Sequence, residues 1–225
     1  MTLFQELDNA QQNLMLKHLQ LVIDANKTLN LTRIDSLEEG KLLHIEDSLS
    51  ALPEIEQAPQ GLYCDLGTGG GFPGIPIAIA TGRKTLLADT RKKKVETLGK
   101  IVEELGLANQ VELYAGRAEQ LARNKRSIAS VITARALSKL SVIMELASPL
   151  LKQDGLLVCY KSHIDKEEYS NARRVEPLTG LKLVSDRSFT LGEDEFERRI
   201  VTYRKTGKAQ AKLPRQDGFA QKKPL

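Results

Sequence analysis

Cysteine is scarce in this chain, and neither cysteine is placed for metal chemistry. Two occur in 225 residues, Cys64 and Cys159, and each sits inside a short apolar run typical of a buried strand. Neither belongs to a Cys-x-x-Cys pair or has a histidine neighbour, which argues against a zinc site. We therefore expect two reduced thiols in the core of a cytoplasmic protein, and no bound metal.

Long hydrophobic runs are also missing. No apolar stretch approaches the roughly 20 residues that cross a bilayer, so we expect no membrane partner. Residues 1–10 carry Glu6 and Asp8, whereas a signal peptide opens with a basic head and an apolar body. Hydrophobic residues still make up 41% of the chain, which is long enough for one large domain with a well-buried core.

Most of the chain has no excess of basic over acidic residues, and the excess that exists is concentrated at its C-terminal end. Residues 204–225 hold seven of the 33 basic residues but one of the 29 acidic ones, so the remainder, with 26 basic and 28 acidic residues, has a net charge of −2. The bases of this tail are Arg204, Lys205, Lys208, Lys212, Arg215, Lys222 and Lys223. A segment with this charge and no periodicity is typical of contact with a polyanion.

We predict that the basic tail serves RNA, through Lys212, Arg215, Lys222 and Lys223, and that its removal leaves the fold and any cofactor site intact. The competing interpretation is that the tail packs back onto the domain through Phe219, Pro224 and Leu225.

Hydrophobic periodicity divides the rest of the chain into a helical beginning and an alternating strand–helix core. Helical spacing covers residues 3–27 and 37–52, which we expect to form an N-terminal cap (residues 1–55). The predicted strands are 62–66, 85–88, 111–114, 128–133, 156–160, 182–189 and 197–203. The predicted helices between them are 91–105, 140–151 and about 166–174, with a further helix beginning near Ile75.

This order predicts a single α/β domain over residues 1–225, with residues 61–203 as its core. Alternating strands and helices form a mostly parallel sheet that is covered on both faces. The last two strands, joined by the acidic loop 191–195, are expected to close the sheet as an antiparallel hairpin. The sequence therefore indicates a Rossmann-like, seven-stranded fold.

The segment 65–74, Asp-Leu-Gly-Thr-Gly-Gly-Gly-Phe-Pro-Gly, is the most informative motif. It links a strand to a helix start, where glycines let a ligand lie on backbone and the helix offers free N–H groups. Gly69, Gly71 and Gly74 fit the dinucleotide pattern GxGxxG. Read from Asp65, the segment instead fits the loop of S-adenosylmethionine (SAM) methyltransferases, because a carboxylate there suits a ligand with a cationic amino-acid end. We favour SAM over a nicotinamide cofactor.

Polar residues follow several other predicted strands, and ligands of such sheets bind at the carboxyl ends of the strands. Asp89 is placed to accept both ribose hydroxyls, and Ala118 and Glu119 to flank an adenine. Arg135 and Lys161 follow two further strands. Structural alternatives remain for each: Asp89 as a helix-start acid, Glu119 as a surface carboxylate, and Arg135 in a surface salt bridge.

The motifs taken together resemble the ribosomal small-subunit methyltransferase G family, also called glucose-inhibited division protein B, over nearly the whole length. The similarity rests on these segments: Asn30-Leu31-Thr32, His44 with Asp47 and Ser48, Asp65 to Pro76, Asp89 with Lys92 and Lys93, Arg117-Ala118-Glu119, Ala134-Arg135-Ala136, and the ending from Leu213 to Leu225. Two features depart from the family pattern: the tryptophan before the first segment is absent, and residues 95–98 read Val-Glu-Thr-Leu where a Phe-Leu pair is common.

The resemblance implies SAM-dependent methylation of guanosine N7 in 16S ribosomal RNA, with the RNA or the small ribosomal subunit as partner of a monomeric enzyme. It also implies cofactor contacts at Gly67, Phe72, Ala118, Glu119 and Arg135. Guanine N7 carries a lone pair in the neutral base, so we expect no general base, and His44 is a candidate RNA contact. A nicotinamide oxidoreductase and a SAM-binding RNA module without turnover are the alternatives.

Overall fold

The computed structural model describes residues 2–29, 32, 34, 36–192 and 196–225. Asn30 and Leu31 of the N-terminal signature, and residues 193–195 of the acidic loop, lie outside this part of the chain. The strands are β1 (Leu62–Leu66), β2 (Thr85–Asp89), β3 (Val111–Ala115), β4 (Ala129–Arg135), β5 (Leu151–Lys161), β6 (Leu181–Leu191) and β7 (Phe196–Lys205).

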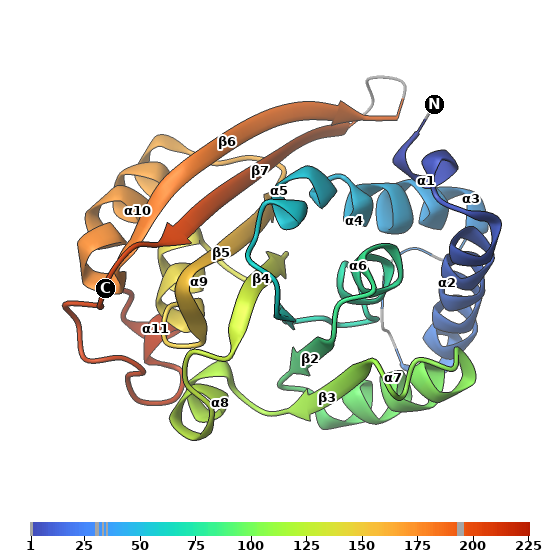
Figure 1. The fold of residues 1–225 in the computed structure, drawn as a ribbon, viewed down its shortest axis with the longest axis horizontal. Coiled ribbons are helices and arrows are strands. Elements are labelled where there is room, and N and C mark those ends of the chain that lie inside the picture. Colours follow the sequence, from blue (N-terminus) through green and yellow to red (C-terminus); the bar gives the residue numbers. More distant parts are fainter. Residues whose placement is uncertain (1, 30–31, 33, 35, 193–195) are drawn as a thin grey trace.

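Seven strands of the described residues form one sheet in the order β3-β2-β1-β4-β5-β7-β6. β7 runs antiparallel to β5 and β6, and the remaining neighbours pair in parallel. The mostly parallel sheet with a closing antiparallel hairpin is thus confirmed. β6 and β7 lie at one edge of the sheet and β3 at the other (Figure 1). β1 and β4 are neighbours between them, where the chain order reverses, so the carboxyl end of β1 is the place where such sheets bind ligands.

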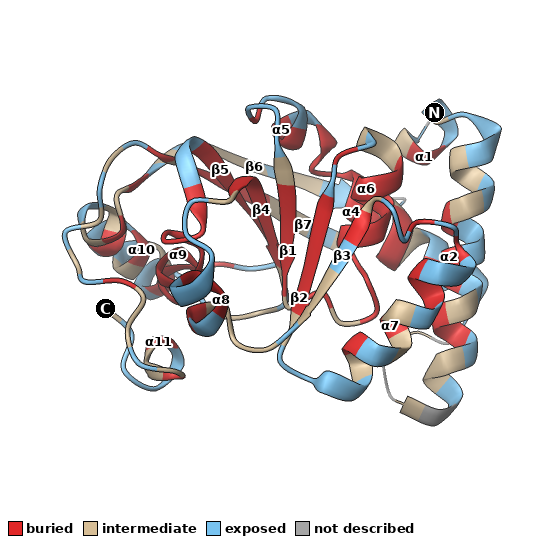
Figure 2. Ribbon diagram, turned by 60° about the horizontal axis from the view of Figure 1, so that its bottom comes forward, coloured by how far each residue is buried: buried red, intermediate tan, exposed pale blue. Residues whose placement is uncertain are grey.

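The helices cover both faces of the sheet. They are α1 (Leu3–Glu6), α2 (Asn9–Leu29), α3 (Leu37–Gly40), the π-helix η1 (Lys41–Glu46), α4 (Asp47–Leu49), α5 (Leu52–Glu56), α6 (Gly74–Thr81), α7 (Lys92–Glu104), α8 (Ala118–Asn124), α9 (Leu140–Ala147), α10 (Lys166–Thr179) and α11 (Phe219–Lys222). α2, α6 and α7 lie on one side of the strands, and α8, α9 and α10 lie on the other (Figure 2).

The core forms two apolar layers because successive strand residues point to opposite faces of the sheet. On β1, Tyr63 packs with the helical cap, α6 and α7, whereas Cys64 packs with α8, α9 and α10. On β2, Leu87 and Leu86 divide in the same way. Both cysteines are free and buried as predicted, and burial raises the pKa of the Cys159 thiol to about 12.

Several boundaries differ from the periodic pattern for identifiable reasons. The predicted helix 3–27 breaks between α1 and α2, because Asp8 accepts a hydrogen bond from the Gln11 backbone N–H at 2.8 Å and starts a new helix. The second predicted helix is divided into α3, η1 and α4. β5 begins at Leu151, five residues before the predicted strand, and the preceding helix ends at Ala147.

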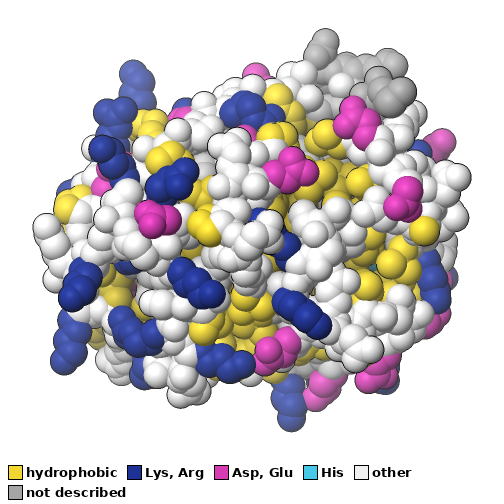
Figure 3. Space-filling view, in the orientation of Figure 1, with side chains coloured by type: hydrophobic (Ala, Val, Ile, Leu, Met, Phe, Trp, Pro, Cys, Tyr) yellow, Lys and Arg dark blue, Asp and Glu magenta, His cyan; other side chains and the backbone are white. Residues whose placement is uncertain are grey.

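The C-terminal tail is ordered and packs onto the domain. Leu213 and Ala220 are buried, Leu225 packs against the apolar layer of α9 and α10, and α11 contacts α9. Lys and Arg side chains gather on the left of the face shown in Figure 3, over α10 and the tail, whereas most Asp and Glu side chains lie to the right. The tail therefore combines a packed apolar side with exposed positive charge.

Candidate cofactor and substrate site

A cavity of about 310 Å³ opens at the carboxyl ends of β1, β2 and β3. Its lining residues come from the glycine loop, the strand ends and the helix starts: Leu66, Gly67, Gly69, Ala88, Asp89, Thr90, Arg91, Lys94, Gly116, Arg117, Ala118, Glu119, Ala136, Leu137, Leu146 and Gln221. Gly67 (φ +77°) and Gly69 (φ +56°) adopt the left-handed conformation, which turns the loop backbone along the cavity. The predicted loop, ribose and adenine positions therefore meet in one cavity.

Asp89 ends β2 and anchors the glycine loop. One carboxylate oxygen accepts a hydrogen bond from the Gly69 N–H at 3.0 Å, and the other accepts from the Arg91 N–H at 2.9 Å. Each oxygen of an ionised carboxylate can accept more than one hydrogen bond. Asp89 is therefore oriented by the backbone while retaining acceptor capacity toward the cavity, and this geometry suits a ribose diol.

The tail contributes to this first cavity, which the sequence did not predict. Glu119 is buried, and its Oε1 accepts a hydrogen bond from the Gly218 N–H at 2.8 Å. Gln221 of α11 lines the same cavity. This contact could not be predicted from composition, because a basic, aperiodic segment does not indicate which of its backbone N–H groups will bond to a carboxylate 99 residues away.

Asp65 lies beneath the loop and does not line this cavity. It is fully buried; its carboxylate accepts hydrogen bonds from the Gly74 N–H at 3.1 Å and the Thr133 hydroxyl at 2.7 Å. Burial raises the pKa of this carboxyl to about 6, and the hydrogen bonds oppose that rise. Asp65 is therefore bonded to the first turn of α6, and its expected contact with a cationic ligand end stays a prediction.

Gly71 and Phe72 also face the protein interior. Gly71 has φ +91°, and a Cβ there would lie 2.9 Å from His18 Nε2. The Phe72 ring is buried between two histidines, at centroid distances of 4.4 Å from His44 and 4.3 Å from His18. These residues join the loop to the helical cap, and neither lines the first cavity.

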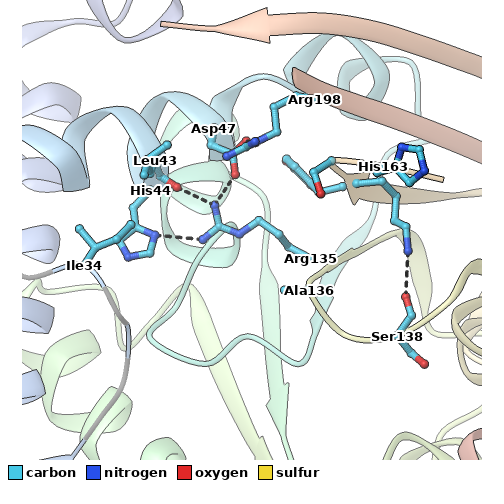
Figure 4. Close-up of a pocket in the computed structure, with 12 residues that line it drawn as sticks. Ile34, Leu43, His44, Asp47, Arg135, Ala136, Ser138, His163 and Arg198 are labelled. Carbon is cyan, nitrogen blue, oxygen red and sulfur yellow. Dashed lines mark hydrogen bonds and ion pairs between the residues drawn. The ribbon is translucent and has the colours of Figure 1, made fainter. Parts of the chain in front are cut away.

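A second cavity, of about 460 Å³, lies between η1, β4, β5 and β7 (Figure 4). It is lined by Ile34, Leu43, His44, Asp47, Arg135, Ala136, Ser138, Tyr160, Lys161, Ser162, His163 and Arg198. Ala136 lines both cavities, so the two adjoin there. A cofactor in the first cavity would thus have a neighbouring basic cavity for a second molecule.

Asp47 organises the wall of this second cavity. Its buried carboxylate accepts from Arg135 Nη1 at 2.7 Å and from Arg198 Nε at 2.8 Å. Arg135 also donates to the Leu43 carbonyl at 3.2 Å. Both arginines converge on Asp47 in Figure 4. Arg198, on β7, was not singled out from the sequence, because a lone arginine in a strand gives no sign of its partner.

His44 is neutral in this arrangement. Burial, and then the nearby charge of Arg135, lower the pKa of the ring to about 3. Nδ1 lies 3.2 Å from Arg135 Nη2 and accepts from it, so the proton resides on Nε2, which is 2.7 Å from the Thr32 hydroxyl. His44 therefore orients Arg135 and does not contribute a positive charge to the cavity.

The remaining predicted RNA contacts separate into three groups. Lys161 lines the second cavity, where its ammonium pairs with Glu168 at 2.6 Å. Arg215 instead forms two bonds, of 2.6 and 2.7 Å, to the carboxylate of buried Glu145. This ion pair holds the tail in place, and an RNA contact of Arg215 stays a prediction. Lys212, Lys222 and Lys223 are exposed.

Neither a bilayer span nor a metal cluster is present in the described part of the chain. Its helices lack the length and apolarity needed to cross a membrane. Its His, Cys, Asp and Glu side chains form no group of three or more that could hold a metal ion.

Solved structures with the same fold include methyltransferases. An O-methyltransferase from Bacillus cereus in complex with SAH has a TM-score of 0.57 at 18% identity, with 83% of this chain and 90% of that chain covered. Geranyl diphosphate C-methyltransferase from Streptomyces coelicolor A3(2), in complex with S-adenosyl-L-homocysteine, has a TM-score of 0.56 at 11% identity, with 72% and 80% covered. The sheet is thus that of Rossmann-like SAM methyltransferases.

Sequence comparison is more specific. Residues 11–197 match the family described as GidB, rRNA small subunit methyltransferase G. Ribosomal RNA small subunit methyltransferase G of Lactobacillus helveticus is 35% identical over 92% of this chain and 88% of its own length. The protein of that name from Listeria welshimeri is 34% identical over 98% and 93%. The chain therefore belongs to the rRNA small subunit methyltransferase G family.

Proposed function

We propose that this protein transfers the methyl group of SAM to N7 of a guanosine in 16S ribosomal RNA. The observation that carries the proposal is the junction of two cavities at Ala136. One has the glycine loop and strand-end acid that suit SAM, and the other is lined by Arg135, Lys161 and Arg198, which suit an RNA nucleotide.

The residues of the first cavity fit SAM, the cofactor of this enzyme. Gly67 and Gly69 present backbone without a Cβ, and a Cβ at Gly69 would meet only the Gly67 carbonyl, at 4.0 Å. Asp89 would hold the ribose hydroxyls, and Ala118 with Glu119 would flank the adenine. Asp65 supports the loop from below through Gly74. The bound cofactor supplies an electrophilic methyl group on its sulfonium.

Methylation of N7 requires little acid–base catalysis by the protein. The N7 lone pair is free in neutral guanine, so the rate depends on alignment and on excluding water. Arg135 is held by Asp47, the Leu43 carbonyl and His44, so it shapes the cavity wall and attracts phosphate. An arginine that bound guanine O6 and N7 together would block the reacting nitrogen.

Cofactor binding gives the first prediction. SAM at 100 times its dissociation constant should stabilise the fold by about 2.7 kcal/mol, and NAD should not. Asp89→Ala should weaken SAM binding by about 1–3 kcal/mol, because the ribose hydrogen bonds are removed. Glu103→Ala, an exposed acid on α7 outside the cavity, is the control. Thermal shift measures the stabilisation and calorimetry measures the affinity. Stabilisation by NAD alone would contradict the assignment of SAM as the cofactor.

The pH dependence of methyl transfer gives the second prediction. Single-turnover rates should vary little between about pH 6.5 and 8.5, because N7 needs no deprotonation. His44 lines the substrate cavity but does not titrate in this range, since its pKa is lowered to about 3. A log-linear rise in rate across the range would report an essential deprotonation and contradict methylation at N7.

Transfer itself tests the proposal against a SAM-binding module without turnover. Methyl-labelled SAM is incubated with either free 16S ribosomal RNA or small ribosomal subunits. We expect label in the RNA with one of these substrates, and Asp89→Ala should slow transfer at low SAM concentration. Binding of SAM and RNA without transfer to either substrate would favour the non-enzymatic module.

We infer that residues 1–225 act as one monomeric methyltransferase domain in the cytoplasm. The cap (1–55) shares an apolar layer with the core (61–203), and the tail (204–225) packs on the opposite layer. In the described residues the exposed large hydrophobic side chains are scattered over α2, α3 and β6: Leu16, Leu37 and Val184. They form no continuous patch of the kind used by stable dimers.

A further inference from the structure

A third cavity lies at the far end of the sheet from the proposed reaction site. It has a volume of about 490 Å³ and lies between the start of β5, the end of β7 and the tail. Four of its 13 lining residues are basic and none is acidic. The basic residues are Arg126, Lys205, Lys208 and Lys212.

Lys205 is the unusual member of this group. Its side chain is buried, yet its ammonium donates to two neutral acceptors, Ser148 Oγ and the Thr179 carbonyl, both at 2.7 Å. An ammonium has three donors, so one remains for a ligand. Burial, and then the charge of Arg126, lower the pKa of Lys205 to about 8. Burying a cation without a counter-charge is costly, and a bound anion would offset that cost.

The other three cations also lack acidic partners. Arg126 donates to the Leu213 carbonyl at 2.9 Å. Lys208 and Lys212 are exposed and form no hydrogen bond or ion pair within the described residues. Arg215 of the same tail, in contrast, is neutralised by Glu145. The basic residues around this cavity thus have no acidic partner, whereas a basic residue of the neighbouring tail does.

We propose that this cavity and its lysine rim bind phosphates of the RNA backbone, at nucleotides that flank the methylated one. The proposal rests on the RNA substrate proposed above. The paired residues Lys161 and Arg199 mark the end of β5 next to the second cavity, and Leu156 and Arg204 mark the end next to the third. The two pairs are five residues apart along the strands, which corresponds to about 16 Å. The cavity is therefore remote from the reacting base. Four cations match more than one phosphate, which favours a polyanion over a single small phosphate.

The test compares two double variants that each remove two positive charges. Lys208→Gln/Lys212→Gln changes the rim of the cavity. Lys100→Gln/Lys182→Gln changes two exposed lysines that do not line it and have no bonded partner in the described residues. Dissociation constants for 16S ribosomal RNA are measured from about 50 to 200 mM salt. The rim variant should flatten the logarithmic salt slope by about 0.7–0.9 for each phosphate that it no longer neutralises, and the control should not.

Two further measurements distinguish RNA from small phosphate as the ligand, and distinguish a wrong phosphate site from a wrong proposed function. The control variant should methylate RNA at the wild-type rate, because it changes neither the reaction site nor the proposed phosphate site, whereas the rim variant should need more RNA to reach half of its maximal rate. Equal salt slopes for the two variants, with methylation intact, would overturn the phosphate site and leave the proposed function standing. Inorganic phosphate is compared with chloride at equal ionic strength. If it stabilises the wild type but not the rim variant, and RNA slopes are equal, the ligand is a small phosphate and the RNA proposal is wrong.

Discussion

Asp47→Ala should lower the free energy of unfolding by about 3–5 kcal/mol, because it leaves two largely buried guanidinium groups without their shared carboxylate. The side chains of Asp47, Arg135 and Arg198 are 6%, 16% and 20% exposed. Asp47 joins the helical cap to β4 and β7, so its removal should also disorder the second cavity. Urea denaturation measures the stability, and single-turnover methylation measures the effect on the site.

An exposed ion pair provides the control for Asp47. Asp24 pairs with Lys27 on α2, with its side chain 49% exposed, so solvent screens the pair and Asp24→Ala should cost far less stability than Asp47→Ala. Asp47→Asn keeps the shape and removes the charge, and should lie between the two. A cost for Asp47→Ala no larger than that for Asp24→Ala would show that the two arginines do not depend on this carboxylate.

Removing residues 208–225 should destabilise the protein and weaken SAM binding. The truncation leaves Glu145, whose side chain is 3% exposed, without Arg215, and leaves Glu119 without the Gly218 N–H. Removal of one partner of a buried ion pair costs about 3–5 kcal/mol. For a chain of this size that corresponds to a fall in Tm of roughly 6–20 °C. Differential scanning calorimetry and SAM titration measure the two effects.

Point variants separate the packing of the tail from its charge. Arg215→Gln should reproduce most of the decrease in stability, since it breaks the bond to Glu145. Lys222→Gln/Lys223→Gln, at two exposed positions, should leave Tm and SAM affinity unchanged. If the truncated chain keeps its stability and its cofactor affinity, the tail is a free RNA arm, as its composition alone would suggest.

The elements that sequence analysis located well are those with local signals at both ends. β1 has the predicted bounds, because an apolar run ends at a glycine loop. α8 was missed, since seven residues at a strand end carry too little periodicity to stand out. α11 was missed for a related reason: four residues within a basic segment show no apolar pattern, although the tertiary contact of α11 with α9 stabilises it.

The candidate site shows the same limit at the level of side chains. Asp89, Gly67, Gly69, Ala118 and Glu119 line one cavity because their positions follow from strand ends, which topology brings together. Residue type alone does not reveal which backbone N–H will donate a hydrogen bond to a given carboxylate. The roles of Asp65 beneath α6 and of the tail against Glu119 could therefore be found only in three dimensions.

The position of the transferred methyl group tests the central claim most directly. Ribosomal RNA is methylated with labelled SAM, digested to nucleosides and resolved by mass spectrometry. Because N7 of neutral guanine reacts without losing a proton, the account predicts that the label appears as 7-methylguanosine. Label on a ribose hydroxyl or on an exocyclic amine, both of which must lose a proton during transfer, would contradict it.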